Sequence, residues 1–181
     1  MATPIVHSVH FYDEPTALVS RLCGIVGSAL RIGNAVLIIA SKPHRDSLVR
    51  ALGEGGLDVQ KHARQGQFTM FDAEEILATF MRKGMPKREL FMDSIGGLLN
   101  DAKSSSKPKH MGLTVFGEMV ALLWEEGRRE AAIQLEKLWN ETLGQSAFHL
   151  HCAYPRAAFG KDIDDHLLIE VCHAHTHVMT A

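Results

Sequence analysis

A glutamate placed directly after an apolar segment is the first residue of this sequence that could do chemistry. Glu118 follows Leu113–Phe116, with one glycine between them. An acid at the end of a strand can orient a water molecule or a metal ion. A structural role is the alternative, because the helix dipole alone favours an acid in the first turn of a helix. We therefore keep Glu118 as a candidate ligand-binding residue.

A basic segment follows the apolar run Ala35–Ala40, at the position where α/β nucleotide-binding proteins hold phosphate. A phosphate-binding loop needs the pattern GxxxxGK[ST], because its glycines let backbone N–H groups surround the phosphates. The segment Ser41–Ser47 has neither glycine, and Pro43 lacks a backbone N–H. Lys42 and Arg45 could meet an anion at a helix start, although a solvated basic turn is the simpler interpretation. This segment argues against an NTPase and leaves Lys42 as a candidate contact.

Histidines are unusually frequent and gather in two places. The chain has eleven of them, and the clustered ones are His149, His151, His173, His175 and His177. Imidazole together with the thiol of Cys152 or Cys172 would suit zinc. However, the sequence has no HExxH or CxxC pattern and no HxH pair with a matching distant acid. We expect polar core and helix-end histidines, and no bound metal.

Three aromatic or imidazole side chains end an extended segment near the N-terminus. They are His10, Phe11 and Tyr12, and they suit either the wall of a small-molecule pocket or the closure of the core. Both interpretations stay open.

No serine lies in a GxSxG turn, and no cysteine has an activating neighbour in the sequence, so covalent catalysis lacks a candidate nucleophile. We expect a protein that is not an enzyme.

The elements that must position these residues alternate between strands and helices. Extended segments are predicted at 5–12, Ala35–Ala40, Gln67–Phe71, Met111–Phe116 and Ala147–Ala153. Helices are predicted from Pro15 to Arg31, from a cap at Asp46 or Ser47 to Gly53, over Ala73–Lys83 after a cap at Asp72, over Leu90–Leu99, from Gly117 to Trp124, over Arg128–Leu143 and from Asp162 to about His177. The stretch Ser104–Lys109 is predicted to be a polar linker. This order indicates a three-layer α/β fold with a mainly parallel central sheet.

Composition and charge exclude several classes of protein. The chain has 181 residues, which is the size of one domain, and we treat 1–181 as such. Its 19 basic and 21 acidic residues give a net charge of -2, without the basic surface that nucleic-acid binding normally needs. The apolar runs are too short to span a membrane, and the N-terminus does not resemble a secretory signal. Three widely spaced cysteines suit a reducing compartment, so we expect a cytoplasmic protein. From the charge balance and the short apolar runs, we expect no direct nucleic-acid partner and no membrane partner.

Five short segments, in order over nearly the whole chain, together carry a family resemblance. They are His10–Tyr12, Gly33–Arg45, Phe116–Met119, Leu135–Asn140 and Cys152–Pro155. They resemble the MEDS domain, named for methanogens, methylotrophs and the dichloromethane-regulator sensory domain. The resemblance implies a RecA/KaiC-like core that has lost its phosphate loop and that senses small molecules such as hydrocarbon derivatives. It also implies a partner, since such domains are attached to histidine kinases or to DNA-binding units.

These observations lead to a functional hypothesis with two alternatives. We expect a non-catalytic sensory module for signal transduction, which binds a small organic ligand at the carboxyl edge of the sheet without a cofactor. The expected ligand contacts are His10, Tyr12, Lys42, Glu118 and Tyr154. Its partner would be a histidine kinase or transcription regulator on another chain, because no output unit follows in this sequence. One alternative is a nucleotide-binding or residual NTPase domain. The other is an interaction protein whose Leu135, Leu138 and Trp139 form a dimer surface, so a homodimer stays open.

Overall fold

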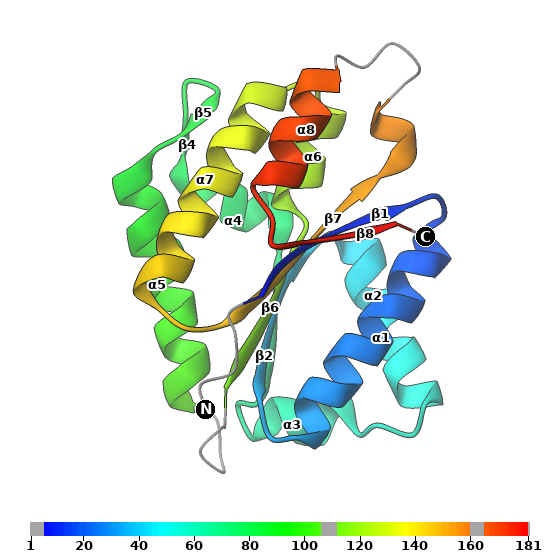
Figure 1. The fold of residues 1–181 in the computed structure, drawn as a ribbon. Coiled ribbons are helices and arrows are strands. Elements are labelled where there is room, and N and C mark those ends of the chain that lie inside the picture. The colour runs from blue at the N-terminus through cyan, green and yellow to red at the C-terminus, as the bar shows by residue number, and fades with distance from the viewer. Residues whose placement is uncertain (1–5, 106–111, 160–164, 181) are drawn as a thin grey trace.

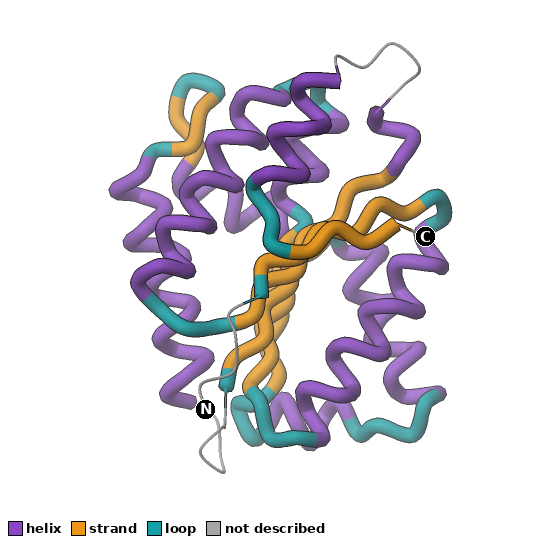
Figure 2. Tube along the Cα trace, in the orientation of Figure 1, coloured by secondary structure: helices purple, strands orange, loops and turns teal. Residues whose placement is uncertain are grey.

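A six-stranded parallel sheet runs through the centre of the molecule, in the order β3-β2-β6-β7-β1-β8 (Figures 1 and 2). The structure is a computed structural model that describes residues 6–105, 112–159 and 165–180. The strands are β1 (His7–Tyr12), β2 (Ala35–Ala40), β3 (Phe68–Asp72), β6 (Leu113–Gly117), β7 (His149–Pro155) and β8 (His177–Thr180). All neighbouring strands are parallel, so every connection must cross over the sheet.

Helices cover both faces of this sheet and make three layers (Figure 1). One face is covered by α1 (Pro15–Arg31), α2 (Lys42–Glu54) and α3 (Val59–Arg64). The other is covered by α4 (Ala73–Phe80), α5 (Arg88–Ser105), α6 (Met119–Glu125), α7 (Arg129–Gln145) and α8 (Asp165–His173). A short hairpin of β4 (Met81–Arg82) and β5 (Met85–Pro86) links α4 to α5, and a 3-10 turn, Arg156–Phe159, follows β7. The three-layer α/β architecture predicted from the sequence is confirmed.

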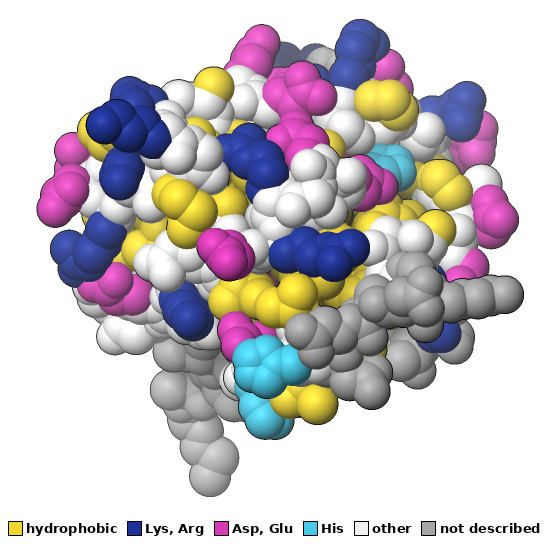
Figure 3. Space-filling model, turned by 90° about the horizontal axis from the view of Figure 1, so that it is seen from above, with side chains coloured by type: hydrophobic (Ala, Val, Ile, Leu, Met, Phe, Trp, Pro, Cys, Tyr) yellow, Lys and Arg dark blue, Asp and Glu magenta, His cyan; other side chains and the backbone are white. Residues whose placement is uncertain are grey.

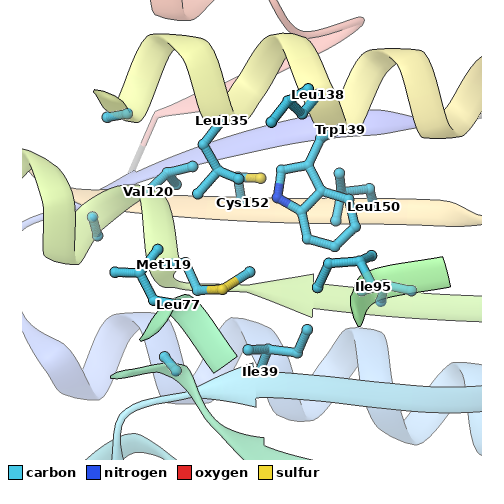
Figure 4. Close-up of a cluster of buried hydrophobic side chains, with 14 of the residues drawn as sticks. Ile39, Leu77, Ile95, Met119, Val120, Leu135, Leu138, Trp139, Leu150 and Cys152 are labelled. Carbon is cyan, nitrogen blue, oxygen red and sulfur yellow. The ribbon is translucent and has the colours of Figure 1, made fainter. Parts of the chain in front are cut away.

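Burial on both faces explains the composition of the central strands. All six residues of β2, Ala-Val-Leu-Ile-Ile-Ala, are buried, and their side chains alternate between the two cores. The larger core lies under α7, where Leu135 and Trp139 pack over Cys152 of β7 (Figure 4). The ring of Trp139 also meets Phe91 edge-on, with ring centroids 5.3 Å apart. This core therefore joins α5 and α7 to the sheet.

The helix connections diverge between two neighbouring strands. The chain leaves β2 for α2 on one face, whereas it leaves β6 for α6 on the opposite face (Figure 1). In open α/β sheets, the crevice for a ligand forms where the connections diverge in this way, outside the carboxyl ends of the strands. This edge contains Tyr12, Ser41, Asp72 and Glu118.

Several predicted boundaries are wrong for identifiable reasons. The helix expected from Asp46 begins at Lys42, because Pro43 lies in the first turn, where its missing N–H costs nothing. The helix expected to reach Lys83 ends at Phe80, where the β4–β5 hairpin begins. The turn between β4 and β5 places Lys83 and Gly84 at positive φ.

The C-terminal part departs most from the prediction. The helix expected to reach His177 ends at His173, and His177–Thr180 instead adds β8 to the edge of β1. A strand of four residues has too little pattern to be distinguished in sequence from the end of a helix. Most of the predicted linker Ser104–Lys109, and the predicted helix start at Asp162, lie outside the described residues. In the described ranges, no helix has the length and apolar character needed to span a bilayer.

The packing of Trp139 gives a stability prediction. Replacing Trp139, which is fully buried, by alanine should lower the free energy of unfolding by about 3–5 kcal/mol, because it leaves a cavity between α5, α7 and the sheet. Equilibrium unfolding in urea measures this difference. The control is Ile32→Ala at a side chain that is 66% exposed, which should change the value by less than about 0.5 kcal/mol. Equal losses in the two variants would contradict the packing.

Candidate functional site at the carboxyl edge of the sheet

The carboxylate of Glu118 joins the ends of the two strands at which the connections diverge. Glu118 precedes α6 but does not cap it; its Oε2 accepts a hydrogen bond from the backbone N–H of Ser41 at 2.8 Å. Its Oε1 lies 2.6 Å from Nδ1 of His44 in the first turn of α2. Its own N–H donates to the carbonyl of Ile39 in β2. The buried carboxylate of Glu118 thus connects β6 with β2 and α2. Its role is therefore larger than that of an acid placed at a helix start only because the helix dipole favours it there.

The electrostatics of this edge follow from that carboxylate. The hydrogen bond that His44 donates to the Glu118 carboxylate raises the pKa of His44 above its usual range, although burial acts in the opposite direction. Burial and, to a smaller extent, the charge of Glu118 raise the pKa of the Tyr12 hydroxyl, whose ring meets that of His44 edge-on at 6.3 Å. Burial and the same carboxylate also raise the pKa of Glu125. Tyr12, His44, Glu118 and Glu125 therefore form one electrostatic group, which favours an imidazolium at His44.

The start of α2 is already occupied by an anion of the protein itself. Ser41 is the single residue between β2 and α2, and its N–H is taken by Glu118. A carboxylate at this helix start fills the place in which a phosphate would bind. Lys42, by contrast, has a side chain that is 74% exposed and pairs with Asp46 within its own helix. Arg45 does not lie free in a solvated turn, since it pairs with Asp72 at 2.6 Å.

A groove runs along α1 and α2 from this edge. Its volume is about 350 Å³, and it is lined by Pro15, Thr16, Val19, Pro43, His44, Ser47, Arg50, Ala51 and Glu54. Both apolar and polar side chains contribute to this lining, and in small-molecule sites a few polar groups orient the ligand. His44 belongs both to the wall of the groove and to the Glu118 pair, so the groove and the sheet edge meet at this ring.

On the face of the molecule that is seen from above, the charged side chains are mixed in sign (Figure 3). Seen from above, acidic and basic side chains lie interspersed with hydrophobic ones, without a large area of one sign (Figure 3). Such a face gives no long-range field of the kind that attracts a polyanion.

None of the five predicted contact residues is among the residues that line the groove. His10 is buried between Ser8 and a small cavity of about 70 Å³, and burial lowers its pKa to about 4. Tyr12 lines the same small cavity. Tyr154 points into the core on the opposite face, where its hydroxyl donates to Oε1 of Glu136 at 2.8 Å. The structure thus brings Tyr12 and Glu118 together around His44, and separates them from Lys42 and Tyr154.

The sequence analysis misses two residues of the sites, one on α2 and one on α7, and it assigns three residues of α7 to a surface. His44 is one of them, although its place two residues after Lys42 puts it in the first turn of a helix at the sheet edge. Glu136 is another, and its signal is that it lies on the buried stripe of α7, three residues before Trp139. The expected dimer surface of Leu135, Leu138 and Trp139 is wrong, because all three side chains are buried within the molecule.

Comparisons with known proteins agree with this architecture. The family model described as MEthanogen/methylotroph, DcmR Sensory domain (MEDS) matches residues 6–176. An uncharacterized protein from Pyrococcus horikoshii, PH0321, solved in complex with an unknown peptide, is similar with a TM-score of 0.62 and 16% identity, over 96% of this chain and 75% of that one. PH0250 from Pyrococcus horikoshii OT3 is similar with a TM-score of 0.56 and 11% identity, over 97% and 81%. No curated protein matches the chain significantly.

The Glu118–His44 pair gives a pH prediction. Since the folded-state pKa of His44 lies above its unfolded value of about 6.5, the pair stabilises fully below that pH, and its contribution is lost as the pH rises through the folded-state pKa. The loss of unfolding free energy in His44→Gln should therefore be largest near about pH 6 and shrink toward about pH 9. Urea unfolding at several pH values measures it. An NMR titration should also show that Glu118→Gln lowers the pKa of His44, whereas the control Glu126→Gln leaves it unchanged. A loss that grows with pH would contradict the assignment.

Proposed function

The chain belongs to the MEDS family of sensory domains, and on that premise we propose that it is a non-catalytic sensor that binds a small organic ligand in the groove between α1 and α2. Membership of the family gives a sensory and regulatory role. The proposal adds the place of binding, the class of ligand and a partner kinase or transcription regulator. The observation that carries it is the His44 ring, held by the buried Glu118 at the wall of the groove.

The lining of the groove supports a small, partly apolar ligand. Its volume of about 350 Å³ falls at the lower end of the range for small-molecule sites. Pro15, Val19 and Ala51 offer apolar surface, while His44 and Ser47 offer hydrogen bonds. Because Nδ1 of His44 is directed at Glu118, Nε2 is the ring atom left for a ligand. A hydrocarbon derivative with one hydrogen-bond acceptor suits this combination.

The same carboxylate provides a route from the ligand to a partner. Glu118 holds α2 through Ser41 and His44 and stands at the start of α6 on the opposite face of the sheet. A ligand that displaces α2 therefore acts on α6 through a direct hydrogen-bonded contact. Binding in the groove would bias the position of α6, and a partner that contacts its exposed end at Glu125 would read the change.

The chemistry at the sheet edge supports a role without nucleotide hydrolysis. Glu118 fills the anion position at the start of α2, and Lys42 pairs with Asp46 at the surface. A nucleotide would have to displace the carboxylate and would meet its negative charge. The three free cysteines support a cytoplasmic location for this sensor.

Chemical-shift mapping tests the proposed function. We would titrate the full ¹⁵N-labelled chain with small alcohols, methylated amines and halomethanes, and separately with magnesium-ATP. At least one of the organic classes should shift the amides of 15–19 and 43–51 in a saturable way. Ala51→Leu, which fills the groove without touching Glu118, should abolish those shifts.

Two further titrations distinguish a ligand in the groove from general surface binding and from nucleotide binding. His166→Ala, at an exposed histidine on α8, should leave the organic titration unchanged and is matched to His44→Ala, which should weaken it. Saturable shifts at 41–46 with magnesium-ATP would favour the nucleotide-binding alternative. The absence of saturable shifts along the groove with all three organic classes would overturn the proposal.

A further inference from the structure

Four potential metal ligands meet on the face of the sheet opposite the groove. They come from four separate elements: His7 from β1, Glu136 from α7, Cys152 from β7 and His175 from the turn between α8 and β8. All four side chains are buried, and their ligand atoms lie within 4.8 Å of one another. Cys152 itself lies beneath Leu135 and Trp139 of α7 (Figure 4). We propose that these four residues bind one divalent metal ion of the zinc class.

The distances fit the edges of a tetrahedron around such an ion. Oε2 of Glu136 lies 3.4 Å from Nε2 of His7 and 3.4 Å from Nε2 of His175. The sulfur of Cys152 lies 3.7 Å from the same oxygen and 3.6 Å from Nε2 of His7. Zinc bonds of about 2.0–2.1 Å to nitrogen and about 2.3 Å to sulfur give tetrahedral edges of about 3.3–3.6 Å. The two remaining separations, from His175 to His7 and from His175 to Cys152, lie within 4.8 Å, so an ion fits once these atoms move closer together.

Hydrogen bonds behind the ligands settle which ring nitrogen faces the centre of the cluster. Asn140 donates from Nδ2 to the carbonyl of Ala174, so its Oδ1 must accept, and Nδ1 of His7 lies 2.8 Å from that oxygen. Nδ1 of His175 lies 2.6 Å from the carbonyl of Val171. Both rings thus carry a proton on Nδ1 and are free to present the lone pair of Nε2. Metal-bound histidines are oriented by such outer bonds.

Without a metal ion, an imidazolium at one of the two histidines is what balances the charge of Glu136. The Nε2 atoms of both rings and a carboxylate oxygen of Glu136 converge, and Nε2 of His175 is buried with no hydrogen-bond partner among the described residues. Protonating both rings would bring two positive charges together on rings whose centroids are 4.0 Å apart. One divalent ion satisfies all the lone pairs at once. With Glu136 and the thiolate of Cys152 ionised, it also makes the buried site neutral.

Metal binding at this cluster requires a path for the ion and the release of the thiol proton of Cys152. A cavity of about 330 Å³ between α7 and α8 has Glu136, Asn140, Val171 and Ala174 in its lining, and we expect an ion to enter from this side. Burial and the neighbouring Glu136 raise the pKa of the Cys152 thiol well above its usual range. The thiol proton is therefore released to solvent as the metal–sulfur bond forms.

Four protein ligands with no open position are typical of structural rather than catalytic metal sites. His175 is the ligand that lies in the last part of the chain, directly before β8. Binding of the ion thus ties the α8–β8 segment to β1, β7 and α7.

No metal is expected from the sequence, because the four ligands form no short motif and neither His7 nor Glu136 belongs to a histidine cluster. His149, His173 and His177, which belong to the clustered histidines, are not among the four ligands.

Cobalt substitution tests the proposal on the full chain. After treatment with a chelator, the protein should bind one equivalent of Co²⁺ and show the intense visible bands of tetrahedral cobalt with a near-ultraviolet thiolate-to-cobalt band. Zn²⁺ should displace the cobalt and raise the melting temperature relative to the chelated protein. Cys152→Ser should lose the thiolate band, and Asn140→Ala, which removes the partner of His7, should weaken binding by about 10–100-fold.

Matched variants identify the ligands. Cys172→Ser and His173→Ala alter a thiol and an imidazole close to the same cavity but outside the cluster, and both should bind cobalt as the unmodified chain does. Far-UV circular dichroism confirms that each variant is folded. The absence of a thiolate band in the unmodified chain would overturn the proposal without reference to any variant. Loss of the band in Cys172→Ser, with retention in a folded Cys152→Ser, would also overturn it.

Discussion

A parallel sheet covered by helices on both faces leaves no side on which a charged group can be solvated, and this protein nevertheless buries two carboxylates against its sheet. Glu118 lies at the carboxyl edge, and Glu136 lies under α7 on the larger core. A buried carboxylate is costly unless its oxygens find hydrogen bonds or cations. The two glutamates therefore dictate which polar groups surround them and where those groups come from.

The two acids are satisfied in different ways, and the difference separates their roles. Glu118 takes a backbone N–H and an imidazole that borders a solvent-accessible groove, so its environment can change when the groove is filled. Glu136 takes the hydroxyl of Tyr154 on one oxygen and faces two Nε2 atoms and a thiol with the other. One acid thus lies where a ligand can act on it, whereas the other lies inside a cluster that joins distant parts of the chain.

The fold is largely predictable from local pattern, and the sites are not. The buried run Ala35–Ala40 and the amphipathic helix of Pro15–Arg31 have the length and periodicity that identify a strand and a helix. The prediction of Asp72 as a cap is confirmed, since its carboxylate accepts hydrogen bonds from the N–H groups of Glu74 and Glu75. By contrast, α3 and β8 contain too few residues to show a period. The cluster of His7, Glu136, Cys152 and His175 is assembled by the crossovers, so no window of the sequence contains it.

The position of β1 within the sheet has a consequence for how the protein is made. This strand lies between β7 and β8, so both of its neighbours come from the last part of the chain. On the ribosome, β1 emerges before both of its neighbours, so its two edges stay unpaired until β7 and β8 have been synthesised. A strand whose two edges are both unpaired is prone to pair with other chains. The sheet is therefore completed only after β8 has been synthesised, and β1 has to be kept from pairing with other chains until then.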